Sequence, residues 1–175
     1  MIDKHKTQSG FTLIEMILYV ALVAIFINSA IVFAWNVIGG GSKSAVEREV
    51  NQNLRLGAKR IAYEIRNAAG VISVSAEELC LLSADPARSP TKIYSSGGRL
   101  RIGWGGGGAN CIGVMTNDEP LTGNLITLSS LVFADRSSGT ASTNIDFSLT
   151  ISATGDRQEW QKTGSLSGTA ELRSN

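Results

Sequence analysis

The sequence is short of the side chain that most often carries catalysis at neutral pH. It holds one histidine among 175 residues, His5, which lies close to the N-terminus. Histidine is the commonest general base because its pKa lies near neutrality. No G-x-S-x-G nucleophile elbow and no serine–lysine pair stands out either. We therefore expect that this chain is not an enzyme.

The chain also lacks an excess of charge of either sign. Lys and Arg number 16 against 15 Asp and Glu, which gives a formal net charge of +1 at pH 7. A strongly basic chain would point to nucleic acid or to acidic lipid as a partner. This composition offers no such argument, so nucleic acid is not an expected partner.

Charged residues are absent from one long segment, residues 16–38, which is 23 residues of mostly apolar sequence. As a helix it would be about 34 Å long, enough to cross a hydrocarbon core of roughly 30 Å. Tyr19 and Trp35 lie near its two ends, where aromatic side chains favour the membrane interface. Asn28 could bond to another helix or be satisfied within its own helix, and both readings stay open. The segment predicts a membrane-spanning helix.

The residues just before this segment carry the most specific pattern in the chain. Gly10 and Phe11 are followed by three residues and then by Glu15, an acid at the head of the apolar run. A carboxylate at the centre of a membrane helix costs roughly 2.5 to 3.5 kcal/mol, and less near the end of the helix. Glu15 therefore needs a cationic partner. Cleavage after Gly10 would create a cation nearby, the α-amino group of Phe11.

Together with the short basic N-terminal stretch, this pattern resembles the class III signal of type IV pilins and type II secretion pseudopilins. The glycine, the terminal phenylalanine and the acidic fifth residue of that family match Gly10, Phe11 and Glu15. The resemblance implies that a prepilin peptidase removes residues 1–10, that Phe11 is N-methylated, and that Glu15 acts in subunit assembly. A secretory signal peptide differs, because its cleavage site follows the apolar core.

The function implied by the resemblance is structural. The chain is expected to be a minor pilin or pseudopilin, anchored in the bacterial inner membrane with a periplasmic C-terminal head and later incorporated into a filament. Its expected partners are other pilin subunits, the prepilin peptidase, the inner-membrane assembly platform and the lipid bilayer, and no cofactor is expected. The alternative is a membrane-anchored periplasmic module that binds DNA, a surface or a secretion substrate without entering a filament.

A glycine run and a second helical pattern follow the apolar segment. Residues 39–41 are three glycines, which cost roughly 2 to 3 kcal/mol of helix propensity relative to alanine and predict a break, a bend or a flexible hinge. The alternative is that packing keeps the helix continuous. Beyond them one apolar stripe recurs at helical spacing and predicts an amphipathic helix packed on a sheet of the same chain: Val46, Val50, Leu54, Gly57, Ile61, Ile65, Ala68 and Ile72. Residues 60–68 resemble the equivalent helix of J-type minor pseudopilins and W-type minor pilins.

Short apolar runs separated by turn residues make up the rest of the chain. The expected strands are residues 71–74, 79–83, 92–94, 99–102, 111–116, 125–134, 145–152 and 169–173. A helix followed by strands is the α+β pattern, here a long N-terminal helix packed on a C-terminal antiparallel β-sheet head. The predicted organisation is a leader over 1–10, a transmembrane helix over 11–38, a glycine break and amphipathic helix over 39–69, and a β-rich head over 70–175.

Few residues of the predicted head suggest site chemistry. Cys80 and Cys111 are a possible disulfide in an oxidising periplasm, with two buried free thiols as the alternative. Two cysteines without a further histidine make no zinc site, and no metal is expected. Asp118 and Glu119 could join a calcium site, although adjacent acids in a turn are usually only solvated. Residues 103–108 match G-x-G-x-x-G, but strand-like sequence follows them, so we expect a flexible loop and no nucleotide.

Overall fold

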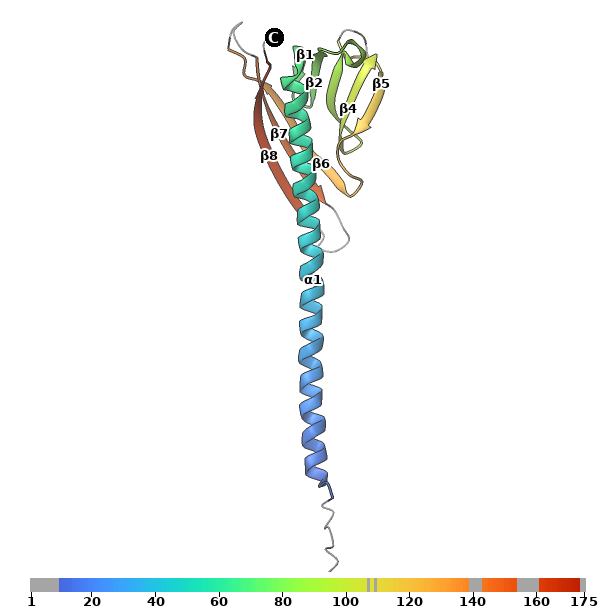
Figure 1. Cartoon of the computed structure of the whole chain (residues 1–175), viewed down its shortest axis with the longest axis vertical. Coiled ribbons are helices and arrows are strands. Elements are labelled where there is room, and N and C mark those ends of the chain that lie inside the picture. The colour runs from blue at the N-terminus through green and yellow to red at the C-terminus, as the bar shows by residue number, and fades with distance from the viewer. Residues whose placement is uncertain (1–9, 107, 109, 139–142, 154–160, 174–175) are drawn as a thin grey trace, which may run out of the picture. The chain divides into compact units, whose positions relative to one another are not determined.

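The computed structural model describes residues 10–106, 108, 110–138, 143–153 and 161–173 (Figure 1). The helix α1 (Leu13–Arg66) comes first, and antiparallel strands follow it, which confirms the predicted α+β class. The elements after α1 are β1 (Ala68–Ser75), β2 (Glu78–Ser83), the 3₁₀ turn η1 (Pro86–Arg88), β3 (Thr91–Ser96), β4 (Arg99–Gly106), β5 (Met115–Pro120), β6 (Ile126–Asp135), β7 (Asn144–Ala153) and β8 (Lys162–Glu171). The chain divides into two compact units, Met1–Gly41 and Ser42–Asn175, and the second unit is called the head below.

The helix α1 runs through the glycine run without interruption, so the predicted break at residues 39–41 is wrong at the level of secondary structure. Glycine lowers helix propensity but keeps the N–H that the helical hydrogen bond needs. Proline lacks this N–H, and its ring collides with the preceding turn. The chain has no proline before Pro86. The boundary between the two compact units nevertheless falls at this run, after Gly41.

The end of α1 differs from the prediction. In the sequence, the helical spacing of apolar residues continues to Ala68 and Ile72. In the structure α1 ends at Arg66, and both residues belong to β1. Asn67 follows the last helical residue: its backbone N–H makes a final helical bond to the Tyr63 carbonyl at 3.1 Å, and its side-chain amide donates to the same carbonyl at 2.9 Å. The β-branched residues that follow in β1 favour strand over helix.

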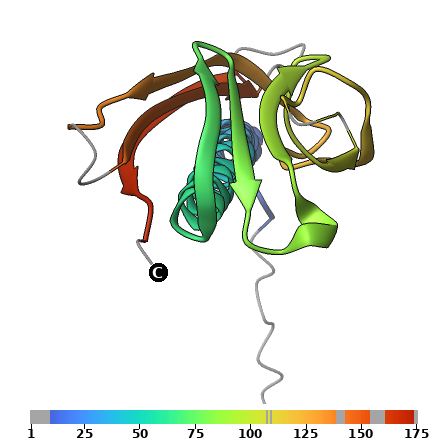
Figure 2. The same cartoon turned by 90° about the horizontal axis from the view of Figure 1, so that it is seen from above.

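The head contains two antiparallel sheets (Figure 2). One has the order β1-β2-β3-β4-β5 and the other the order β6-β7-β8. The turn between β3 and β4, which joins the expected strands 92–94 and 99–102, is a glycine hairpin in which Gly97 and Gly98 take φ values of 59° and 69°. Backbone bonds join the sheets, for example from Leu128 N–H to the Gly98 carbonyl at 2.7 Å. Figure 2 shows the sheets curving around the part of α1 that belongs to the head.

The core of the head lies between α1 and both sheets. Val50, Leu54, Ile61 and Ile65 are buried on α1, as the stripe predicts, and they pack with the inward residues of the strands. Gly57 lies on the same face, where a Cβ atom would come within 3.0 Å of Leu149 Cδ2. Its lack of a side chain lets α1 approach the sheets closely.

Two strand assignments change in the second half of the first sheet. Of the predicted strand 111–116, the structure places only Met115 and Thr116 in β5, and Cys111 has a left-handed φ of 57°. Residues 117–120, which include the acids Asp118 and Glu119 that were expected in a turn, form the rest of β5. Gly103 was predicted in a flexible loop but lies in β4, where a Cβ atom would come within 2.6 Å of Met115 Cγ. Glycine is thus required there for β4 and β5 to pair.

The last strand is longer than predicted. β8 spans Lys162–Glu171, whereas the sequence predicts a strand only over 169–173. Its glycine- and serine-rich first half has low strand propensity. Each of its residues pairs with one of β7 without a register shift, so tertiary pairing determines the strand.

Candidate functional site

The N-terminal end of α1 holds the predicted processing site, and Thr12 organises it. Thr12 precedes the first helical residue, Leu13, and its side-chain oxygen accepts a hydrogen bond from the Glu15 N–H at 3.4 Å. Its carbonyl accepts from the N–H of Met16 at 3.3 Å. Thr12 is therefore the N-cap of α1, and Glu15 stands at the third helical position. Thr12 is not among the predicted site residues, although Thr-x-x-Glu, the capping-box pattern, is visible in the sequence.

Gly10 and Phe11 lie just outside the helix. Phe11 is 72% exposed, and its ring meets that of Tyr19 edge-on with centroids 6.4 Å apart. Among the residues that the structure describes, none would lie within 4 Å of a Cβ atom built on Gly10. The fold of this chain therefore does not require glycine at position 10, and the Gly10–Phe11 peptide bond is in non-helical backbone.

Glu15 is partly exposed and forms no ion pair with any residue that the structure describes. A carboxylate in the first turn of a helix is stabilised by the helix dipole, typically by about 0.3 to 1 kcal/mol. That gain is smaller than the cost of a charge in an apolar surrounding. The position thus leaves Glu15 able to take a cationic partner from outside the described chain.

The apolar part of α1 is exposed along its whole length. Its large apolar side chains from Leu13 to Ile38 are at least 50% exposed. The polar side chains within it are satisfied locally: Asn28 Nδ2 donates to the Ala24 carbonyl at 3.0 Å and Ser29 Oγ to the Phe26 carbonyl at 2.8 Å. Asn28 is thus satisfied within its own helix, which is one of the two alternatives that the sequence left open. The helix is long and apolar enough to cross a membrane.

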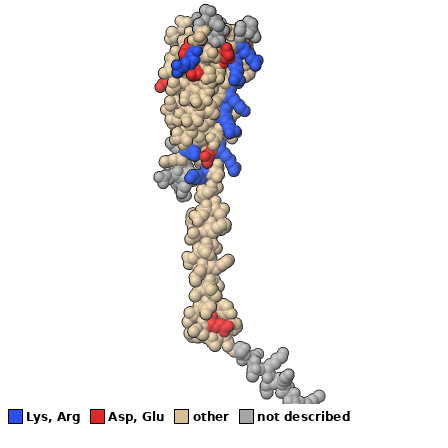
Figure 3. All heavy atoms as spheres, turned by 90° about the vertical axis from the view of Figure 1, so that its left-hand side faces the viewer, with Lys and Arg blue, Asp and Glu red and all other residues tan. Residues whose placement is uncertain are grey.

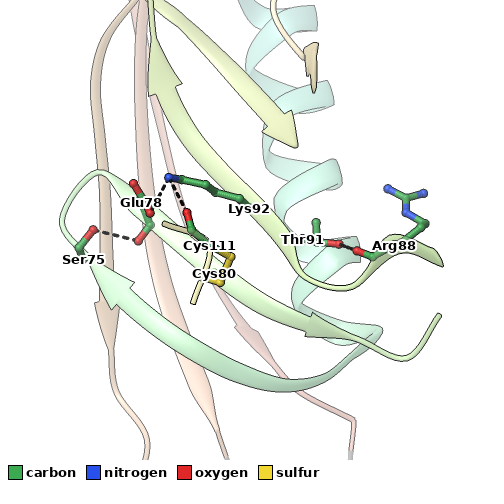
Figure 4. The surroundings of a disulfide bond; sticks show 7 residues. All are labelled: Ser75, Glu78, Cys80, Arg88, Thr91, Lys92 and Cys111. Atoms are coloured by element: carbon green, nitrogen blue, oxygen red, sulfur yellow. Dashed lines mark hydrogen bonds and ion pairs between the residues drawn. A yellow bond between two sulfur atoms is a disulfide. The ribbon is translucent and has the colours of Figure 1, made fainter. Parts of the chain in front are cut away.

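The head contains the Cys80–Cys111 disulfide (Figure 4). It joins β2 to the loop before β5, and both cysteines are fully buried. Lys92 on β3 secures the same loop, since its Nζ donates to the Cys111 carbonyl at 3.3 Å and pairs with Glu78 at 2.8 Å. The disulfide closes a sequence separation of 31 residues.

A Cys80→Ser/Cys111→Ser chain is expected to lose about 3 to 4 kcal/mol of unfolding free energy, because opening this loop returns chain entropy to the unfolded state. Urea unfolding of the full chain in detergent micelles measures the change. A reductant should lower the unfolding midpoint of the unaltered chain and leave that of the double variant unchanged. A double variant with the midpoint of the unaltered chain would contradict the prediction.

Asp118 lies in a strand and forms an ion pair. The Arg101 guanidinium on β4 contacts the Asp118 carboxylate on β5 at 2.8 to 3.0 Å. The hydrogen bond from Arg101 holds the pKa of Asp118 below its usual value. Among the described residues no group of three or more His, Cys, Asp or Glu side chains is arranged to hold a metal ion. The glycines of residues 103–106 lie in β4, and β4 is followed by loop and strand instead of the helix that a dinucleotide fold needs.

Glu64 does not belong to the apolar stripe of α1 and is nevertheless buried. It is 8% exposed and accepts from Arg60 at 2.6 Å and Arg88 at 3.2 Å, while the Arg88 guanidinium stacks 4.9 Å from the Trp104 ring centroid. A buried charge needs such partners. These contacts link α1 to η1 and β4, which gives Glu64 a structural role.

Comparison with known proteins identifies the N-terminal signal. Residues 5–27 match the family model of the prokaryotic N-terminal methylation motif. No curated protein and no solved structure matches the chain. The chain thus carries a type IV pilin-like prepilin signal, and this signal with the apolar helix fits a membrane-anchored protein.

Proposed function

We propose that this chain is a minor subunit of a type IV pilus or of a type II secretion filament. The observation that carries the proposal is the prepilin signal at residues 5–27, which continues into an exposed apolar helix. An apolar helix of this length has to be covered by lipid or by other helices. A filament subunit uses both in turn, first lipid before assembly and then neighbouring subunits.

In the first step a prepilin peptidase hydrolyses the Gly10–Phe11 bond. This role explains a glycine that the described fold does not need, because no described residue comes within 4 Å of a Cβ atom at position 10. The carboxylate product leaves with residues 1–10, and the new α-amino group stays on Phe11. Methylation of that amine keeps its positive charge.

Before assembly, α1 anchors the subunit in the inner membrane with the head in the periplasm. The Cys80–Cys111 disulfide supports an extracytoplasmic head, because disulfides persist in oxidising compartments. An inner-membrane assembly platform then extracts the subunit from lipid. The head contributes no catalytic step to this function.

During assembly Glu15 pairs with the Phe11 amine of a neighbouring subunit. Each charge alone is costly in an apolar surrounding, and the pair offsets part of that cost. Because only one axial offset between neighbours brings the two groups together, the pair sets register. Packing of the apolar helices supplies most of the cohesion.

We further propose that the subunit is a minor one, of the J- or W-type. Ile112 and Val114 are 85% and 92% exposed on the loop held by the disulfide. A subunit repeated throughout a filament has to cover such side chains at every contact, whereas a subunit present in few copies keeps them for particular partners.

Quantification of the subunits in sheared, purified filaments tests this function. We expect the chain in the filament fraction, at a small fraction of the dominant band. Its absence from filaments in cells that assemble them would favour the alternative, an anchored binding module. If the chain is itself the dominant band, the minor assignment is wrong and the filament function stands.

A further inference from the structure

The outer edge of β8 is an open strand edge. β8 is the last strand of its sheet, so only its other edge pairs, with β7. In the part of the chain that the structure describes, the backbone groups of residues 162–171 have no hydrogen-bond partner beyond β7. Every second residue of this strand therefore presents a free N–H and a free carbonyl outward.

This edge lacks the features that usually prevent pairing with another chain. Between Lys162 and Glu171, β8 carries no charge and no proline, and its pairing with β7 shows no bulge. Soluble proteins commonly protect long edges with those very features. An unprotected edge of this length is suited to accept a strand from a partner.

β8 lies beside α1 over the length of the strand. Lys162 Nζ contacts Glu47 Oε1 at 3.0 Å at one end, and the Arg173 N–H, just after the strand, donates to the Arg66 carbonyl at 3.4 Å at the other. Near the end of β8 a hollow of about 600 Å³, called the groove below, lies between the two elements and has the small side chains of Ala58 and Ala62 in its lining.

Cations without a salt-bridge partner among the described residues follow one face of α1 and reach the groove. Arg48, Arg55, Lys59 and Arg66 recur at helical spacing on one exposed face of α1, in a row about 27 Å long. Within the described residues none of them forms a salt bridge. Three cations line the hollow, Lys59, Arg66 and Arg173, and none of its lining residues is acidic.

Figure 3 views the head from the side on which Figure 1 places β8. A broad surface without charge occupies the middle of the head, and a column of Lys and Arg borders it. The open edge of β8 and the cations are thus both accessible to a partner from this side of the head.

From these features we propose that β8 accepts an extended acidic segment of another protein as an additional strand. The backbone of the segment would pair with the free edge, and its acidic side chains would lie over the groove. Alternate residues of a strand are about 6.8 Å apart, close to the axial rise of roughly 6 Å between Arg55 and Lys59. The side chains between them would lie on the face of Ser165 and Ser167, where hydroxyl side chains pair well across strands.

The test uses the purified full chain in detergent micelles and a labelled peptide in which glutamate alternates with threonine. Binding is measured by fluorescence anisotropy. Two further peptides carry N-methyl groups, one on its glutamates and the other on its threonines. Only one of these sets of amides can face β8, so one methylated peptide should lose binding and the other should keep it. Equal binding of both would overturn strand pairing.

The charge contribution is tested with matched variants. Lys59→Gln/Arg66→Gln should weaken peptide binding by roughly 3- to 30-fold, from about 0.3 to 1 kcal/mol for each exposed pair. The control Lys43→Gln/Arg99→Gln removes the same charge elsewhere and should leave binding unchanged. A peptide with lysine in place of glutamate should not bind. Equal weakening by the two variants would overturn the proposed groove.

Two results would assign the site to another occupant and so overturn the proposal. The first is displacement of the peptide by a duplex oligonucleotide that binds more tightly than the peptide and whose binding depends on Lys59 and Arg66. The second is self-association of the chain with which the peptide competes. The proposal does not depend on filament assembly, because peptide binding is measured on isolated chains.

Discussion

A Glu15→Gln chain is expected to be cleaved and inserted normally but to be absent from filaments. The substitution removes the charge that would pair with the Phe11 amine of a neighbour. Glutamine also keeps the capping-box pattern with Thr12, so the start of α1 should be preserved. We expect at least a tenfold loss from sheared filaments, measured by immunoblotting against the membrane fraction.

Two companion variants separate charge pairing from helix capping. Thr12→Ala removes the cap, at a cost of about 0.5 to 2 kcal/mol, and should still assemble because the carboxylate remains. Glu77→Gln removes an exposed acid from the head and should have no effect. Normal incorporation of Glu15→Gln would exclude the pairing role.

A Gly10→Leu chain is expected to stay uncut in cells that contain the peptidase. The resemblance to prepilins implies a peptidase site that admits only small residues before the cut. No described residue lies within 4 Å of a Cβ atom at position 10, so leucine should not disturb folding. Essentially complete retention of the precursor is expected, together with loss of filament incorporation.

Mass spectrometry of the membrane form provides the measurement. The unaltered chain should begin at methylated Phe11, and the Gly10→Leu chain should retain residues 1–10. Gly10→Ala, a small substitution, serves as the control and should still be cleaved. A natural chain that keeps Met1 in peptidase-positive cells would contradict the processing prediction.

Several features of the fold follow from local sequence. The apolar segment 16–38 predicts its helix because length and composition alone decide it, and the glycine hairpin at Gly97 and Gly98 is set by two left-handed residues. The buried stripe of Val50, Leu54, Ile61 and Ile65 follows from helical periodicity. The same periodicity misleads at Ala68 and Ile72, because two strand residues happened to continue the spacing.

The sequence by itself thus determined the prepilin signal, the apolar helix and the order of a helix followed by strands, since each depends on residues near one another in the chain. Tertiary structure alone decided that Asp118 lies in a strand opposite Arg101 and that Glu64 is buried between two arginines. It also decided that the glycine- and serine-rich β8 is a strand with a free edge. These features depend on partners distant in sequence, and strand pairing and charge burial are energies of contact that local propensity does not contain.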